Sequence, residues 1–165
     1  PLLKMLLKNY TKILLNILNN EFLRKFQSIN AFFTCILMDI DAESGIIKYA
    51  AAGHPSQILI QNGEIKKLIS TGKIIGVNEN VKYKQYELSF QKNDKLFLFS
   101  DGIFEEFNYL REEFGEEKLW TLLQTNANKP VSETLHLVVQ QLDVFLENVH
   151  QEDDMTFIGI EYKSP

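Results

Sequence analysis

Two short acidic motifs stand at the ends of predicted strands and could bind a divalent cation. In the first, the apolar run Phe97–Phe99 leads into Ser100-Asp101-Gly102. A carboxylate at a strand end is held rigidly, as a metal ligand must be, and the glycine lets the backbone turn sharply. In the second, Asp153-Asp154 stands just before the predicted final strand. Adjacent carboxylates repel each other unless a cation lies beside them, and Mg²⁺ and Mn²⁺ select oxygen ligands.

Each motif also has an ordinary structural interpretation. Asp101 could be an Asx-turn residue that caps the next helix, because Asp-Gly is a common turn signal. Asp153-Asp154 could be a solvated acidic loop. The two motifs are more informative together than apart, because an antiparallel sheet can bring two strand ends to one place.

The histidines and the cysteine are weaker candidates. His54, in Gly53-His54-Pro55, could be a general acid, a metal ligand, a phosphate contact or simply a turn residue. His136 falls within a predicted helix. His150 lies beside the acidic loop, where an exposed histidine is favoured over one that approaches a metal. Cys35 lies in a predicted buried strand, which favours an inert core thiol over a nucleophile.

Length and composition narrow the class of protein. The chain has 165 residues, which fits one domain, and a formal net charge of −5. Its pI of about 5.3 argues against a nucleic-acid partner and against contact with an anionic membrane. One cysteine excludes a disulfide framework within the chain and a multi-cysteine metal site. The sequence contains no glycine-rich phosphate loop, no serine nucleophile elbow and no zinc spacing. We expect a cytoplasmic protein.

The charge is unevenly distributed along the chain. Residues 1–29 carry a balance of +4, whereas residues 101–117 carry seven acids against Arg111, a balance of −6. Residues 150–154 add −3. We expect the glutamates between Glu105 and Glu117 to be solvated surface residues.

Periodicity and turn signals predict a mixed, strand-rich chain. A helical apolar stripe covers 2–26, and Phe32–Ile40 is apolar enough for a strand buried on both faces. Asn62-Gly63 is typical of a tight hairpin turn. The predicted elements are a helix or two joined helices over 2–26, hairpins over 32–51 and 57–69, strands over 83–90 and 95–100, helices around 119–123 and over 131–145, and a final strand over 155–162.

The order of the motifs resembles the metal-dependent protein phosphatases (PPM superfamily), and within them the SpoIIE/RsbU-type bacterial serine/threonine phosphatases. The resemblance covers residues from about 30 to 162. It rests on Phe33-Thr34, Tyr49-Ala50-Ala51-Ala52-Gly53-His54-Pro55, Ser70-Thr71-Gly72, Phe99-Ser100-Asp101-Gly102 and Gln151-Glu152-Asp153-Asp154-Met155-Thr156.

The resemblance implies an α+β fold in which an antiparallel β-sandwich is flanked by helices. It also implies a binuclear Mn²⁺ or Mg²⁺ centre whose water attacks phosphoserine or phosphothreonine. Asp101 and Asp153 match metal-binding, catalytic aspartates of the family, and Asp154 is a neighbouring, weaker metal candidate. The implied substrate is a phosphorylated protein, such as a STAS-domain anti-sigma-factor antagonist in a partner-switching pathway.

The chain departs from the family pattern in one respect. The family has an early aspartate followed by Gly-His-Gly, and Gly-His-Gly occurs nowhere in this sequence. Either this motif lies upstream of residue 1, or the chain is a divergent member that lacks it. The uncapped helical pattern at residue 2 favours the first, so we expect residues 1–165 to be a single, partial phosphatase domain, incomplete at its N-terminus and inactive by itself. Unpaired sheet edges would favour self-association, as in a homodimer. Two alternatives stay open: a pseudophosphatase that binds phosphoproteins without catalysis, and an interaction domain whose acidic loops have no chemical role.

Overall fold

The computed structural model describes residues 9–147, 149–151 and 153–163, and its elements follow the predicted order. The predicted N-terminal helix is seen from Tyr10, and residues 2–8 lie outside the described residues. The elements are α2 (Tyr10–Phe26), η1 (Gln27–Ile29), β1 (Cys35–Asp41), β2 (Ile46–Ala52), β3 (Gln57–Gln61), β4 (Glu64–Leu68), β5 (Tyr86–Ser89), β6 (Lys95–Phe99), η2 (Asp101–Ile103), α3 (Glu116–Thr125), α4 (Val131–Leu146) and β7 (Phe157–Glu161).

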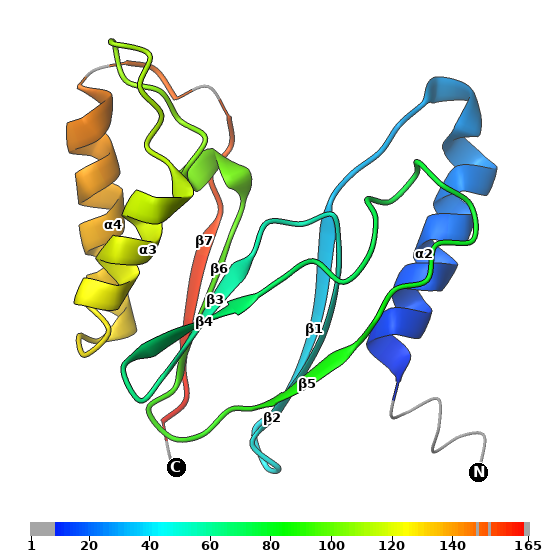
Figure 1. Cartoon of the computed structure of the whole chain (residues 1–165), viewed down its shortest axis with the longest axis horizontal. Coiled ribbons are helices and arrows are strands. Elements are labelled where there is room, and N and C mark those ends of the chain that lie inside the picture. The colour runs from blue at the N-terminus through cyan, green and yellow to red at the C-terminus, as the bar shows by residue number, and fades with distance from the viewer. Residues whose placement is uncertain (1–8, 148, 152, 164–165) are drawn as a thin grey trace. The chain divides into compact units, whose positions relative to one another are not determined.

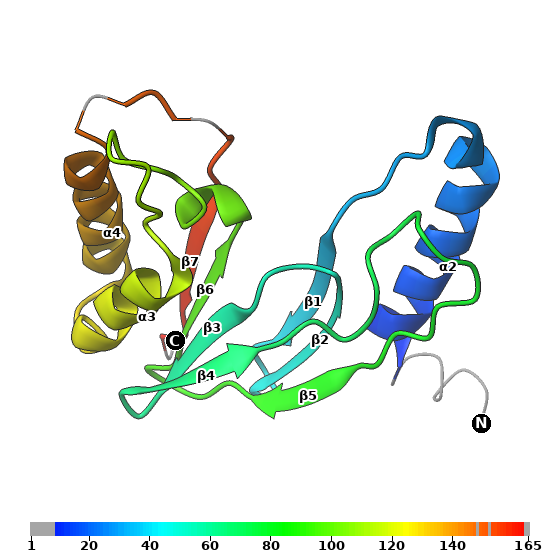
Figure 2. The same ribbon diagram turned by 45° about the horizontal axis from the view of Figure 1, so that its top comes forward.

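The described residues form two compact units. The first joins the stretch that ends at Ser56 to Ile69–Gln91, and the second joins Gln57–Leu68 to the stretch that begins at Lys92. Neither unit is one continuous segment. Each contains one antiparallel sheet with helical cover (Figures 1 and 2), so the predicted α+β class with antiparallel strands is confirmed.

The first unit contains a three-stranded sheet in the order β1-β2-β5. Its two antiparallel pairs place Cys35 opposite Ala52 and Tyr49 opposite Tyr86. The helix α2 packs on this sheet through Leu15, which is buried against Ala50 and Ala52. The alanines of β2 are small, so the helix can approach the sheet closely.

The prediction that Phe32–Ile40 is buried on both faces is wrong. The strand β1 is at the edge of its sheet among the described residues, most of its side chains are partly exposed, and Phe32 is 64% exposed. Composition alone could not show this, because an apolar edge strand and an apolar central strand have the same sequence signature.

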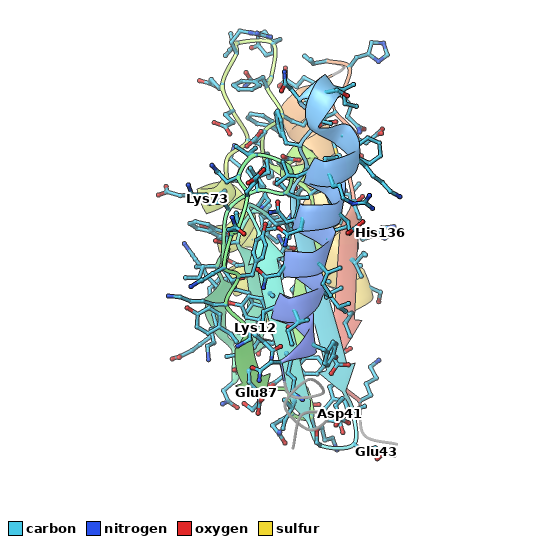
Figure 3. All side chains as sticks on the ribbon, turned by 90° about the vertical axis from the view of Figure 1, so that its right-hand side faces the viewer. Lys12, Asp41, Glu43, Lys73, Glu87 and His136 are labelled. Atoms are coloured by element: carbon cyan, nitrogen blue, oxygen red, sulfur yellow. The ribbon has the colours of Figure 1, made fainter. Side chains whose placement is uncertain are left out.

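The turn between β1 and β2 is closed by Asp41, at the end of β1 (Figure 3). Its carboxylate accepts hydrogen bonds from the backbone N–H groups of Glu43 (3.0 Å) and Ser44 (3.1 Å) and from the Ser44 hydroxyl (2.6 Å). The Ser44 hydroxyl and amide lower the pKa of the Asp41 carboxyl, because they stabilise its charged form. The hydrogen bonds of this exposed aspartate stabilise the turn.

The second unit contains a four-stranded antiparallel sheet in the order β4-β3-β6-β7. Figures 1 and 2 show α3 and α4 along one face of it. Both predicted helices of this region are confirmed, and Pro130 stands at the N-cap of α4. The core between helices and sheet includes Ile58, Ile60, Phe97, Phe99, Ile103, Leu119, Leu123, Val138 and Leu142. No helix in the described part of the chain is long and apolar enough to cross a membrane.

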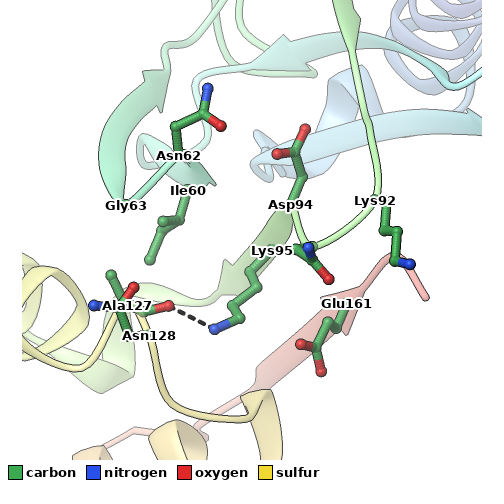
Figure 4. A pocket seen from close by; sticks show the side chains of 10 residues that line it. Ile60, Asn62, Gly63, Lys92, Asp94, Lys95, Ala127, Asn128 and Glu161 are labelled. Atoms are coloured by element: carbon green, nitrogen blue, oxygen red, sulfur yellow. Dashed lines mark hydrogen bonds between the residues drawn. The ribbon is translucent and has the colours of Figure 1, made fainter. Parts of the chain in front are cut away.

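A buried lysine fixes the connection between α3 and α4. The Lys95 ammonium donates to the carbonyl oxygens of Ala127 and Lys129, each at 2.5 Å. It lies at a pocket of about 340 Å³ that Asp94 and Glu161 also line (Figure 4). Because the two carbonyls belong to the loop that follows α3, the bonds tie that loop to β6, and we assign Lys95 a structural role.

Candidate metal centre

The sheet of the second unit brings the two acidic motifs to one end. The antiparallel register of β6 and β7 places Phe99 opposite Phe157. Asp101 therefore follows the end of β6 at the point where the chain from Asp153-Asp154 enters β7. Figure 1 shows the end of β6 and the start of β7 side by side. The sequence expectation that an antiparallel sheet could join the two motifs is met.

Ser100 links the two loops directly. Its hydroxyl donates to the backbone carbonyl of Asp154 (3.2 Å) and accepts from the backbone N–H of Thr156 (2.9 Å). The backbone N–H of Ser100 also donates to the Thr156 carbonyl (3.0 Å). These three bonds extend the β6–β7 pairing past Phe99, so the residue just before Asp101 is fixed against the residues that follow Asp153.

Gly102 allows the loops to touch. A Cβ atom at this position would lie 2.8 Å from the carbonyl oxygen of Asp154, 3.3 Å from its carbonyl carbon and 3.6 Å from Cβ of Asp153. The nearest atoms are backbone atoms, which cannot rotate away. Glycine is required here for space, so the Asp-Gly pair serves the contact between loops as well as the turn.

Asp101 does not cap a following helix, so that alternative is wrong. Its backbone carbonyl accepts from Phe104 and Glu105, each at 2.9 Å, and closes the 3₁₀ turn η2. The next α-helix begins at Glu116 with Gly115 as its N-cap. The half-buried Asp101 side chain contacts the backbone N–H of Gly102 through Oδ1 at 3.2 Å.

Asp153 and Asp154 are exposed, and Asp153 is positioned by a buried glutamate. The backbone N–H of Asp153 donates to Oε1 of Glu106 (3.3 Å), and Oδ1 of Asp153 accepts from the backbone N–H of Asp154 (2.7 Å). Glu106 is only 1% exposed. The expectation that all glutamates from Glu105 to Glu117 are solvated is therefore wrong for Glu106, which packs under the loop that carries Asp153.

The electrostatics of the loops fit a cation-binding site. The pKa of Glu105 is raised, first by partial burial and then by the negative charges of Asp101, Glu113, Asp153 and Glu116. Asp101 and Asp153 therefore both add negative charge near Glu105, and a divalent cation bound in this region would offset that charge. The donors are all carboxylate oxygens, which suit Mg²⁺ or Mn²⁺.

Few side chains are placed to coordinate a metal ion. Among the described residues, no group of three or more histidine, cysteine, aspartate or glutamate side chains is arranged to hold a metal ion. Asp101 and Asp153 thus fit a divalent cation in donor chemistry and in the contact of their loops, while the residues that the structure describes offer too few converging ligands for a tight site.

The sequence reasoning overlooked Gln57, which fixes the end of β6. Its fully buried side chain accepts from the backbone N–H of Phe99 (2.6 Å) and donates to the Phe99 carbonyl (3.1 Å). The backbone pairing of β3 with β6 reaches only Phe97, so the Gln57 amide continues the ladder for one more residue pair. A glutamine at a strand start has no distinctive sequence signature.

The other motifs on which the family resemblance rests lie together in the first unit. The Thr34 hydroxyl lies 3.1 Å from Nδ1 of His54, and the backbone N–H of Gly53 donates to Oγ of Ser70 (3.0 Å). The Thr71 hydroxyl bonds both the N–H and the carbonyl of Ala51. These bonds join three chain segments and support a structural role for His54.

The remaining candidate residues are Cys35, His136 and His150. Partial burial raises the pKa of the Cys35 thiol, which is the direction expected of an unreactive thiol, but Cys35 is only partly buried and does not lie in a core strand as predicted. His136 lies on α4, beside Asp143 and Phe157 in a shallow pocket. His150 is exposed.

Replacing Gly102 by Ala should force the two acidic loops apart. The added Cβ collides with the Asp154 backbone, so we expect a loss of about 1–3 kcal/mol in the free energy of unfolding and weaker Mn²⁺ binding. Urea unfolding and calorimetric Mn²⁺ titration measure the two effects. Gly159→Ala is the matched control, because its Cβ would overpack Val131 within the same unit. It should lower stability without changing the Mn²⁺ affinity, and equal effects on Mn²⁺ affinity in both variants would contradict the assignment.

Comparison with known proteins is consistent with this geometry. The family profile described as Stage II sporulation protein E (SpoIIE) matches residues 4–163. The phosphoserine phosphatase RsbP of Bacillus subtilis is 25% identical over 133 residues, which are 80% of this chain and 31% of RsbP. The chain spans between 23 and 42% of the length of the curated relatives that it matches.

Solved structures show the same fold. The SiaA-PP2C domain of Pseudomonas aeruginosa superposes with a TM-score of 0.77 at 18% identity, over 88% of this chain and 58% of that domain. The phosphatase domain of SpoIIE from Bacillus subtilis, presoaked with Mn, gives a TM-score of 0.59 at 19% identity, over 80% of this chain and 57% of that one. From the profile match over nearly the whole chain, together with these folds, this chain belongs to the SpoIIE family of PPM-type phosphatase domains.

Proposed function

We propose that residues 1–165 are part of one phosphatase domain that hydrolyses phosphoserine or phosphothreonine in a protein substrate. The observation that carries the proposal is the contact between the Asp101-Gly102 and Asp153-Asp154 loops at one end of the β6–β7 pair. The phosphoserine phosphatase RsbP, a relative by sequence, supports the substrate class.

Asp101 and Asp153 would hold the cation, with Asp154 as a weaker neighbour. A bound Mn²⁺ or Mg²⁺ lowers the pKa of its water and offsets charge on the phosphoryl oxygens. The chain's own contribution is positional: Ser100 and Gly102 hold the two loops together, and Glu106 orients the backbone of Asp153. The Mn-presoaked SpoIIE domain supports Mn²⁺ as one such ion. We propose a binuclear centre in the complete domain.

Our proposal for the physiological partner rests on the family resemblance. A phosphorylated STAS-domain anti-sigma-factor antagonist is the substrate that we propose, in a cytoplasmic partner-switching pathway. We further propose that the chain self-associates through its exposed sheet edges, in which case sedimentation would depend on concentration. The acidic net charge of −5 gives no support to a nucleic-acid partner.

The 165-residue chain by itself should have little activity. Gly-His-Gly is missing from the sequence, and the described residues contain no group of three metal ligands. We expect calorimetric titration with Mn²⁺ to show at most one weak site, and phosphate release from a phosphoserine peptide to be near background. Two tight Mn²⁺ sites on this chain would overturn the expectation.

The small ligand set also favours a second candidate function, that of a pseudophosphatase. Such a protein would bind a phosphoprotein without hydrolysing it. The full-length gene product that carries this chain separates the two functions: Mn²⁺-dependent phosphate release that stops on chelation supports the enzyme. Phosphopeptide binding without turnover at any Mn²⁺ concentration supports the pseudophosphatase.

A further inference from the structure

A loop beside the acidic motifs presents two large apolar side chains to solvent. The loop runs from Phe104 to Gly115, and its tip consists of Tyr109 and Leu110, which are 62% and 58% exposed. Single exposed apolar residues are common on protein surfaces. Here two adjacent ones form the tip of a loop whose base contacts the candidate metal site through Glu106.

Both ends of the loop are anchored to the core of the second unit. The backbone N–H of Gly115 donates to the Phe104 carbonyl, and that of Phe114 donates to the Glu106 carbonyl, each at 2.8 Å. The Phe104 ring packs edge-on against Phe99, and both phenylalanines are buried. The two ends of the loop are therefore fixed to the sheet and to each other.

The tip is held in one conformation by Asn108. Its buried side chain accepts from the backbone N–H groups of Leu110 (3.0 Å) and Glu112 (2.9 Å), and its Nδ2 donates to the Glu112 carboxylate (2.9 Å). Arg111 adopts a φ of +61° and lies over the Phe107 ring. Tyr109 and Leu110 are thus exposed on a pre-organised turn, which lowers the entropy cost of binding a partner.

The loop and the carboxylates belong to one surface region. Glu106, within the loop, accepts a hydrogen bond from the backbone N–H of Asp153. Figure 1 shows the yellow-green loop at the same end of the second unit as the stretch that enters β7. A protein substrate whose phosphoserine reaches Asp101 and Asp153 would therefore lie at the end of the second unit that carries this loop.

The charge around the tip selects the partner's chemistry. Glu105, Glu112 and Glu113 are exposed on the loop, and its one basic residue, the exposed Arg111, lies over the Phe107 ring, so the loop has an excess of negative charge. Acidic side chains attract lysine and arginine and repel acidic segments. Tyrosine is enriched among the residues that dominate binding energy at interfaces.

We infer that Tyr109 and Leu110 dock the phosphoprotein substrate by contacting apolar side chains on a surface that also carries lysine or arginine near the phosphoserine. The inference rests on the proposed phosphatase function, whose substrate it characterises. Tyr109 and Leu110 touch the partner away from the phosphate, so they determine specificity and are not catalytic residues.

Fluorescence anisotropy of labelled peptides with the full 165-residue chain tests the inference. The probes are a phosphoserine peptide with flanking leucine and lysine residues, its unphosphorylated form, and a version with glutamate in place of lysine. The double variant Tyr109→Ala/Leu110→Ala should weaken binding of the leucine-lysine peptide by about tenfold or more. The control is Val144→Ala, a residue 63% exposed on α4, which should leave the affinity unchanged. Circular dichroism should show that both variants remain folded.

The unphosphorylated peptide separates the failure of docking from the failure of the phosphatase function. If its binding depends on Tyr109 and Leu110 while the full-length gene product that carries this chain releases no phosphate from the phosphoserine peptide at any Mn²⁺ concentration, docking stands and the phosphatase function fails. If phosphate and Mn²⁺ strengthen binding but the double variant binds like the parent chain, docking is overturned. Preference for the glutamate peptide, or no detectable binding of the leucine-lysine peptide, would also overturn it.

Discussion

Replacing Asp101 by Asn in the full-length gene product that carries this chain should lower Mn²⁺-dependent phosphoserine hydrolysis by at least about 100-fold. The amide keeps the shape of the side chain but removes the negative charge that a divalent cation needs. Asp153→Asn should have an effect of similar size, because its carboxylate comes from the facing loop. The double variant should be little worse than either single variant, since ligands of one site act as a unit.

Asp41→Asn is the matched control for these variants. Asp41 is also an exposed carboxylate at a strand end, but it accepts hydrogen bonds from Glu43 and Ser44 within its own turn. Its replacement should leave turnover unchanged. Asp154→Asn should have a smaller effect than Asp101→Asn, in accordance with its weaker assignment. Steady-state turnover and Mn²⁺ titration measure these effects, and full activity of Asp101→Asn would refute the assignment of that residue.

Replacing Gln57 by Leu should produce the second large effect, a loss of stability. Leucine has a similar volume, but it cannot bond to the buried N–H and carbonyl of Phe99. An unsatisfied buried polar group costs about 1–3 kcal/mol. For the N–H and the carbonyl of Phe99 together, we expect the free energy of unfolding to fall by about 3 kcal/mol. For a domain of this size, that loss lowers the Tm by roughly 6–12 °C.

Thermal unfolding, monitored by circular dichroism, measures this loss of stability. The control is Gln124→Leu, because Gln124 is an exposed glutamine on α3 that makes a hydrogen bond to the Gly63 carbonyl. It should change the Tm by only a few degrees. Since Phe99 lies two residues before Asp101, Gln57→Leu should also weaken Mn²⁺ binding. A Gln57→Leu protein as stable as the parent chain would show that the Phe99 groups find other partners.

Local sequence signals accounted for much of the fold. Amphipathic periodicity located α4 to within one residue at its C-terminal end, and Asn62-Gly63 located the β3–β4 turn. In both cases the signal depends on neighbours in the chain, namely the helical repeat and the left-handed conformation that a tight turn requires.

Burial was harder to predict, because it depends on residues that are distant in sequence. The strand β1 has the composition of an interior strand but lies at a sheet edge. Glu106 and Glu105 are neighbours of identical type, yet Glu106 is buried beneath the Asp153 loop while Glu105 is exposed. Local sequence contains nothing that distinguishes them.

The sequence by itself determined the chemistry available to this protein: two aspartate motifs at strand ends, oxygen donors for a hard cation, and a motif order that resembles the SpoIIE/RsbU-type phosphatases. Only the tertiary structure decided that these motifs touch, because the contact depends on the β6–β7 register, the Ser100 bridge and the missing side chain of Gly102. It also decided which polar residues support them, since hydrogen bonds such as the two between Gln57 and Phe99 join positions 42 residues apart. Residue type and spacing specify what a site can bind, whereas packing specifies whether its parts come together.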